Sequence, residues 1–196
     1  MVKLLMAKNR VAIPARTADR VLKEYNHRCA KCGADNPQLH HIDEDPVNND
    51  PLNLIPLCPN CHLSDQHNPT RFVEPGKLRL FRIYKDPTIL KPQFHPIFTR
   101  LRFFESQEDE FEIEQLEKMA IELTEFIFTL EKGEFYGTKI GQTIIPQDLI
   151  VRNTTVPRFR NDEHKAQRAR EYFQHLQDSK EQVYAWIIEA LRYQPW

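Results

Sequence analysis

Apolar residues recur at helical spacing over two long stretches in the second half of the chain. Within residues 107–131 they stand at Phe111, Leu116, Met119, Ala120, Leu123, Ile127 and Leu130. Within Asp162–Arg192 they stand at Ala166, Ala169, Phe173, Leu176, Val183, Ile187 and Leu191. Steps of three and four residues predict two helices, each with an apolar face. Gly133 is a suitable end for the first helix, and Asn161 or Asp162 is a suitable cap for the second.

The stretch between these helices, residues 134–160, lacks such a stripe. It contains Gly137, Gly141, Pro146 and Pro157, which favour turns and interrupt helices, so we expect a connector. Together the three stretches predict a mainly helical C-terminal region over residues 105–196.

The N-terminal third has shorter elements and many turn residues. Residues Thr17–Tyr25 predict a short helix capped by Thr17. Leu39–Ile42 and Leu54–Leu57 predict short strands, because the residues between them are rich in Pro, Asn and Asp, which favour a loop. A further helix is expected to begin at Cys61 and to stop near Gln66, before an Asn-Pro pair.

Residues 70–100 are basic and contain several prolines, so we expect an irregular segment with one strand at Leu78–Tyr84. The whole pattern indicates an α+β chain in three parts. These are a small module in residues 1–75, a basic irregular segment in residues 76–104, and the helical region in residues 105–196.

Composition narrows the class of protein. The chain has 196 residues, of which 40% are hydrophobic and 28% charged, as in soluble globular proteins. No apolar run approaches the roughly 18 residues that span a membrane. The first ten residues, MVKLLMAKNR, acquire charge too early for a secretory signal, so we expect a cytoplasmic protein. In that compartment four cysteines indicate metal binding more than disulfides.

The formal net charge of −1 conceals a strong pattern. Residues 1–35 and 76–104 are basic and flank an acidic segment, and residues 105–135 are strongly acidic. Two basic segments suit a nucleic-acid backbone, although ordinary solvated surface charge gives the same pattern. The acidic segment does not suit DNA, so we expect it to pack beside the basic segment or to bind a protein.

The four cysteines form two CxxC pairs, Cys29/Cys32 and Cys58/Cys61. Each pair folds as a knuckle that aims two thiolates at one point, and two knuckles complete a closed tetrahedral Zn²⁺ site. Zinc binding contributes on the order of 10 kcal/mol to the folding of small zinc domains, which a segment this poor in apolar residues requires. The alternative is four unrelated thiols or a redox pair.

Around these pairs stand His40, His41, Asn53 and His62, in the string CAKCGADNPQLHHIDEDPVNNDPLNLIPLCPNCH. Over residues 13–68 the chain resembles the zinc-bearing branch of the HNH endonucleases, which have the ββα-metal fold. The resemblance rests on the combination of CxxC, HHI, NLxxLC and CH. One departure is that this chain has Asn48, Asn49 and Asp50 where the family loop often holds glycines, so more than one asparagine is a candidate for the family's Asn. The string NLIPLC favours Asn53.

The resemblance implies roles for these side chains. His41 is the general base that activates water, a task suited to a group with a pKa near neutrality. His40 and His62 hold one catalytic divalent ion, which contacts the scissile phosphate and the leaving 3′ oxygen. Asn53 fixes the loop against the strand. Each of these four residues also has a purely structural interpretation.

The ion is expected to be Mg²⁺ or Mn²⁺, although two His ligands also fit Ni²⁺ or a second Zn²⁺. His67 is a rival ligand, but it follows His62 by five residues, about 140° around an α-helix. On a regular helix it faces elsewhere.

Basic side chains near the module are the candidate phosphate contacts. They are Lys77, Arg79, Arg82, Lys85, Arg100 and Arg102, together with Arg10, Arg16 and Arg20. Phe81 and Tyr84 lie among them and suit stacking on bases, although core packing is the commoner role of such aromatics.

Two functional hypotheses follow. The first is a metal-dependent endonuclease that hydrolyses DNA, with family precedent in the small HNH proteins that work beside an ATPase in anti-phage defence, as in Septu-type systems. Its C-terminal helices and their aromatic residues are then available to a protein partner such as an ATPase. The second is a non-catalytic zinc module that binds nucleic acid or protein. No membrane partner is expected.

Overall fold

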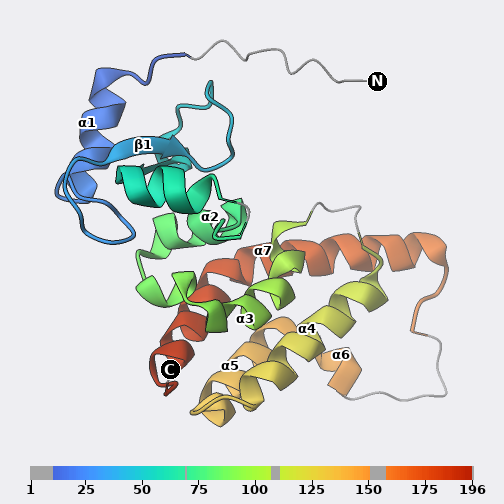
Figure 1. Cartoon of the computed structure of the whole chain (residues 1–196). Helices are drawn as coiled ribbons and strands as arrows, with labels where there is room; N and C mark the ends of the chain where they lie inside the picture. The colour runs from blue at the N-terminus through green and yellow to red at the C-terminus, as the bar shows by residue number, and fades with distance from the viewer. Residues whose placement is uncertain (1–10, 69, 107–110, 151–157, 196) are drawn as a thin grey trace. The chain divides into compact units, whose positions relative to one another are not determined.

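The computed structural model describes residues 11–68, 70–106, 111–150 and 158–195. The chain divides into two compact units, residues 1–90 and 91–196 (Figure 1). It combines helices with one small two-stranded sheet, as the α+β prediction requires. In the described part of the chain, none of the helices has both the length and the apolar character needed to span a bilayer.

The first unit opens with helix α1, Ala15–Glu24, which begins two residues before the predicted Thr17 start. Its N-cap position is Pro14, whose fixed φ suits a helix entry, so Thr17 does not cap it. Strands β1, Gln38–His41, and β2, Leu54–Leu57, pair antiparallel with His41 opposite Leu54. Both strands therefore form where sequence predicted them, to within one residue.

Short helices join and follow this hairpin. The 3₁₀ helix η1, Pro51–Asn53, leads into β2, and the π-helix η2, Asn60–Gln66, follows it. Helix α2, Pro75–Tyr84, and the 3₁₀ helix η3, Pro87–Leu90, complete the unit. The core of this unit is formed by buried apolar side chains from α1, the two-stranded hairpin, α2 and η3. They include Val21, Ile42, Leu54, Ile55, Leu57, Leu78, Phe81 and Ile89.

The strand predicted at Leu78–Tyr84 is wrong, because these residues belong to α2. The alternation of apolar and cationic residues in LRLFRIY mimics a half-buried strand. In the helix, Leu78, Phe81 and Arg82 are buried three and four residues apart, which is helical spacing. The segment 76–104 is consequently not one irregular stretch, since it divides between the two units.

Among the described residues of the second unit, all the regular secondary structure is helical. It begins with η4, Pro92–Phe94, α3, His95–Arg100, and η5, Arg102–Glu105. The longer helices are α4, Ile113–Phe128, and α7, Asp162–Arg192, with the side chain of Asn161 accepting a cap hydrogen bond from His164. The structure thus confirms a helix within 107–131 and places the second helix at the predicted bounds.

The predicted connector is wrong over much of its length. Helix α5, Gly133–Ile144, pairs with α4 through a tight turn, and α6, Gln147–Ile150, follows it (Figure 1). Two glycines of α5 allow this close approach. A Cβ at Gly137 or Gly141 would stand 3.1 or 3.0 Å from the nearest side-chain carbon of α4. Here glycine marks helix packing rather than a break.

Candidate metal centres

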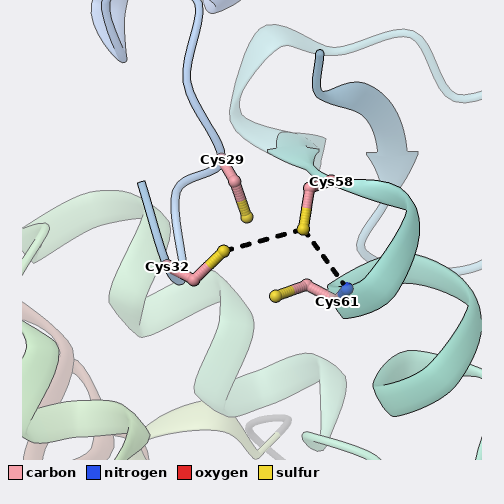
Figure 2. Close-up of side chains that lie close together, drawn as sticks. All are labelled: Cys29, Cys32, Cys58 and Cys61. Carbon is pink, nitrogen blue, oxygen red and sulfur yellow. Dashed lines mark hydrogen bonds between the residues drawn. The ribbon is translucent and has the colours of Figure 1, made fainter. Parts of the chain in front are cut away.

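The two CxxC pairs meet at one point in the first unit. Figure 2 shows the four sulfurs directed toward a common centre, and all four lie within 4.8 Å of one another. The Sγ atoms of Cys32 and Cys58 are 3.6 Å apart. Zn–S bonds of about 2.3 Å in a tetrahedron place sulfurs about 3.8 Å apart. The four cysteines therefore fit a metal such as zinc.

Backbone turns aim the thiols. In the first knuckle the N–H of Cys29 donates to the Ala34 carbonyl at 2.8 Å, and the N–H of Gly33 donates to the Cys29 carbonyl at 2.8 Å. Gly33 has φ +75°, a conformation that favours glycine. The N–H of Ala30 donates to the Pro56 carbonyl of β2, which fixes the knuckle to the sheet.

The thiols of this cluster differ in acidity. The backbone N–H of Cys61 donates to the sulfur of Cys58 and lowers the pKa of that thiol to about 7. Burial raises the pKa of the Cys61 thiol. A cation is therefore needed before all four cysteines carry thiolates at neutral pH.

A second cluster joins three imidazoles. One ring nitrogen from each of His40, His62 and His67 lies within 4.8 Å of those from the other two. The ring centroids of His40 and His62 are 5.1 Å apart, and those of His62 and His67 are 4.8 Å apart. The structure thus brings the predicted ligands His40 and His62 together and adds His67.

The expectation that His67 faces elsewhere is wrong, and the π-helix explains why. In η2 the N–H of His67 donates to the carbonyl of His62 at 3.2 Å, which is an i→i+5 bond. A π-turn stacks residues five apart, whereas an α-turn stacks residues four apart. An H-x4-H spacing was the signal in the sequence, and it indicates this arrangement only when the wider turn is considered.

The environment of His40 prepares it to bind a cation. The residue is 4% exposed, and its Nε2 atom is buried without a hydrogen-bond partner among the described residues. Burial and the neighbouring imidazoles of His62 and His67 lower the pKa of His40 to about 4. The ring is therefore neutral at pH 7 and has a lone pair for a metal ion.

His41 follows His40 on β1 and is half-buried. Its Nε2 atom lies 3.1 Å from Oδ1 of Asn49, in the loop between the strands. From the sequence, Asn48 and Asn49 were alternatives to the favoured Asn53, and the structure gives the contact with the His41 ring to Asn49.

Asn53 is the last residue of η1, directly before β2, and is 5% exposed. Its backbone carbonyl accepts from the N–H of Ile42 at 2.8 Å, and its Oδ1 accepts from the N–H of Asp43 at 3.1 Å. Its Nδ2 donates to Asp43 and to the carbonyl of Asn48. These contacts hold the loop against the end of β1, as predicted for this residue, but the contact with the His41 ring comes from Asn49.

The basic residues predicted to contact phosphate differ in burial and are divided between the two units. Arg82 is 2% exposed, and its guanidinium donates to the carbonyls of Leu54 and Pro51 and to Glu24. It is a buried structural residue, so its assignment as a phosphate contact is wrong. The aromatic Phe81 is 3% exposed and belongs to the core, which leaves no face for base stacking.

Other basic residues vary in exposure. Burial lowers the pKa of half-buried Lys77, whereas Arg79 is exposed on the same helix. Lys85 lies 3.5 Å from Glu24, as part of an exposed ion pair. Arg100 covers the Phe126 ring at 4.3 Å in the second unit. Exposed Arg102 also belongs to that unit, exposed Arg16 and Arg20 belong to the first, and Arg10 lies outside the described residues.

Comparison of the chain with family models, with curated proteins and with solved structures gives no significant match. Function is therefore inferred from the residues and geometry of the two clusters.

Proposed function

We propose that the chain is a metal-dependent endonuclease of the HNH type that hydrolyses phosphodiester bonds in DNA. One observation carries this proposal. Three imidazoles, from His40, His62 and His67, converge beside the strand position that holds His41. The four cysteines alone are sufficient for a structural zinc site, so a purely structural role does not explain the second cluster of three histidines.

The second cluster fits an ion of borderline softness. Its three ligands are imidazoles, which suit Mn²⁺, Ni²⁺ and Zn²⁺ better than Mg²⁺, an ion that prefers oxygen. When bound, such an ion stabilises the negative charge that develops on phosphate oxygens during hydrolysis. Low competition from protons supports binding at neutral pH, because the pKa of His40 is about 4.

His41 has the chemistry for the proton transfer. A neutral imidazole accepts a proton from water as the water oxygen attacks the phosphorus, and the bond to the 3′ oxygen breaks. The products are a 5′-phosphate and a 3′-hydroxyl. Asn53 supports this role indirectly, because its contacts with Ile42 and Asp43 fix the backbone that follows His41.

Plasmid nicking tests the proposal. Zinc-loaded protein is incubated with supercoiled DNA in Mn²⁺, Ni²⁺ or Mg²⁺, beside His41→Ala and a control, His27→Asn. His27 is exposed and has φ 55°, a conformation that Asn tolerates. We expect nicking by the wild type and by the control. His41→Ala should lose about 10²–10⁴-fold in rate, the usual contribution of a general base.

The outcomes separate the two hypotheses. Cleavage that persists in His41→Ala refutes the assignment of the base. Binding of DNA without cleavage in any of the metals favours a non-catalytic zinc module.

A further inference from the structure

The loop between the strands places the side-chain amide of Asn49 at hydrogen-bond distance from a ring nitrogen of His41. Oδ1 of Asn49 lies 3.1 Å from Nε2 of His41, and Nδ2 of Asn49 donates to the carbonyl of Ala12 at 3.5 Å. This carbonyl belongs to the segment that precedes α1. Asn49 thus links the N-terminal segment, the loop and the ring.

The two contacts determine which atoms carry hydrogens. A backbone carbonyl only accepts, so the Asn49 atom facing Ala12 is the amide nitrogen. The atom facing His41 is consequently the amide oxygen, which also only accepts. Nε2 of His41 must then carry the proton, and in the neutral ring the lone pair is on Nδ1.

Asn49 is fixed from both sides along the chain. The side-chain amide of Asn48 donates to the Asp43 carboxylate at 2.6 Å, and the backbone carbonyl of Asn48 accepts from the side-chain amide of Asn53 at 2.9 Å. The side chain of Asp50 accepts from the N–H of Leu52 at 2.7 Å and caps η1. Because both neighbours are anchored, the Asn49 amide is held at the ring at a low further cost in conformational entropy.

We propose that Asn49 is a positioning residue that holds His41 in the Nε2–H tautomer and so presents Nδ1 as the basic atom. The catalytic consequence rests on the proposed nuclease function, whereas the tautomer itself does not. At the position where the resembled family often has a glycine, Asn49 thus supplies a side-chain amide that orients the ring of His41.

Nuclear magnetic resonance tests the tautomer. Zinc-loaded full-length protein is labelled with ¹⁵N in histidine, and long-range ¹H–¹⁵N correlations are recorded at alkaline pH, where imidazole is neutral. We expect the Nε2–H pattern for His41 in the wild type and a mixture of both tautomers in Asn49→Leu. Asn49→Asp still accepts from Nε2 and should retain the Nε2–H form. The control Val47→Ala, which alters an exposed side chain of the same loop and leaves the anchors of Asn49 in place, should also retain it.

An Nδ1–H pattern in the wild type, or an unchanged Nε2–H pattern in Asn49→Leu, overturns the proposal. If Asn49→Leu does not fold, Asn49→Ser makes the same comparison, because its side chain is too short to reach Nε2 in the observed geometry. The tautomer is measured without any cleavage, so a chain that fails to cut DNA does not affect this result.

Cleavage kinetics then test the functional consequence. In an active protein, Asn49→Leu should lower kcat about tenfold or more with little change in KM, as expected for a residue that orients a functional side chain. Asn49→Asp should restore most of kcat. An active wild type whose kcat is unchanged in Asn49→Leu would show that the tautomer does not limit the reaction, and would leave the nuclease assignment standing.

Discussion

Arg82 provides a sharp test of how the first unit is held together. Its guanidinium is 2% exposed and donates to Leu54 at 2.9 Å, to Pro51 at 3.2 Å and to Glu24 at 2.8 Å. The two carbonyls stand at either end of the turn that contains Asn53. We therefore predict that Arg82→Met destabilises the first unit, although methionine preserves much of the apolar stem.

The magnitude follows from the groups left behind. A buried carbonyl without its donor costs about 1–3 kcal/mol. Leu54 is fully buried, whereas Pro51 is partly exposed and regains some contact with water. Glu24 is 27% exposed on its side chain, so its carboxylate recovers much of its hydration. We expect a total loss of about 3 kcal/mol.

Hydrogen exchange of the β1 and β2 amides measures the free energy of opening of the first unit. Trp186 lies on α7 in the second unit, so tryptophan fluorescence gives an independent control that should not change. Arg79→Met, on an exposed position of the same helix, should change stability by no more than about 0.5 kcal/mol.

The Glu24 share of this effect depends on pH. The Arg82 guanidinium lowers the pKa of Glu24 from the ordinary value of 4.5. A lowered carboxyl pKa contributes stability above 4.5, and this contribution is lost as the pH falls through the lowered pKa.

A loss of stability below about 1 kcal/mol in Arg82→Met would refute the structural role of Arg82, since that is the value of a single ordinary hydrogen bond.

Three further predictions concern the rest of the chain. Gly133→Ala should destabilise the second unit by at least about 1 kcal/mol in thermal unfolding, because its Cβ would stand 2.2 Å from a backbone carbonyl of α4; equal stability would contradict that packing. Asn161→Ala removes the cap on the N–H of His164 and should cost about 1 kcal/mol, whereas Asn161→Asp should cost little. Zinc affinity, measured by chelator competition, should fall as the pH falls through about 7, because the pKa of Cys58 is about 7 and that of Cys61 is raised; an affinity independent of pH would exclude thiolate binding.

Much of the local structure could be predicted from the sequence. The two CxxC pairs, the strand that ends in His41 and the helix from Asp162 to Arg192 all form where their patterns indicate. Each signal is local: a ligand spacing, an apolar stretch between turns, or a stripe with a capping residue. Such signals persist in the fold because nearby residues determine them.

The errors came from features that depend on distant contacts. Arg82 looks like its cationic neighbours on α2, and only the positions of Leu54 and Glu24 show that it is buried. In the sequence, Gly137 predicts a break in the helix. In the structure it lies within α5, where the ring of Phe128 fills the space that a side chain would need.

The three-histidine cluster was only partly predicted for a related reason. On a regular α-helix His62 and His67 face different sides. Their H-x4-H spacing brings them together only on a π-turn, and the sequence does not show which kind of turn forms. The contact of Asn49 with His41 likewise depends on how the whole loop folds around Asn53. Neither contact can be obtained from spacing alone.

The role of the three histidines as ligands of a catalytic ion is tested by the rate of plasmid nicking as a function of added Mn²⁺, measured for zinc-loaded wild type and for His67→Ala. If His40, His62 and His67 hold the catalytic ion, the wild-type rate should rise to saturation, and His67→Ala should require at least about tenfold more Mn²⁺. Identical curves for the two proteins would contradict a catalytic ion held by these three histidines, because His67 would then contribute nothing to the site.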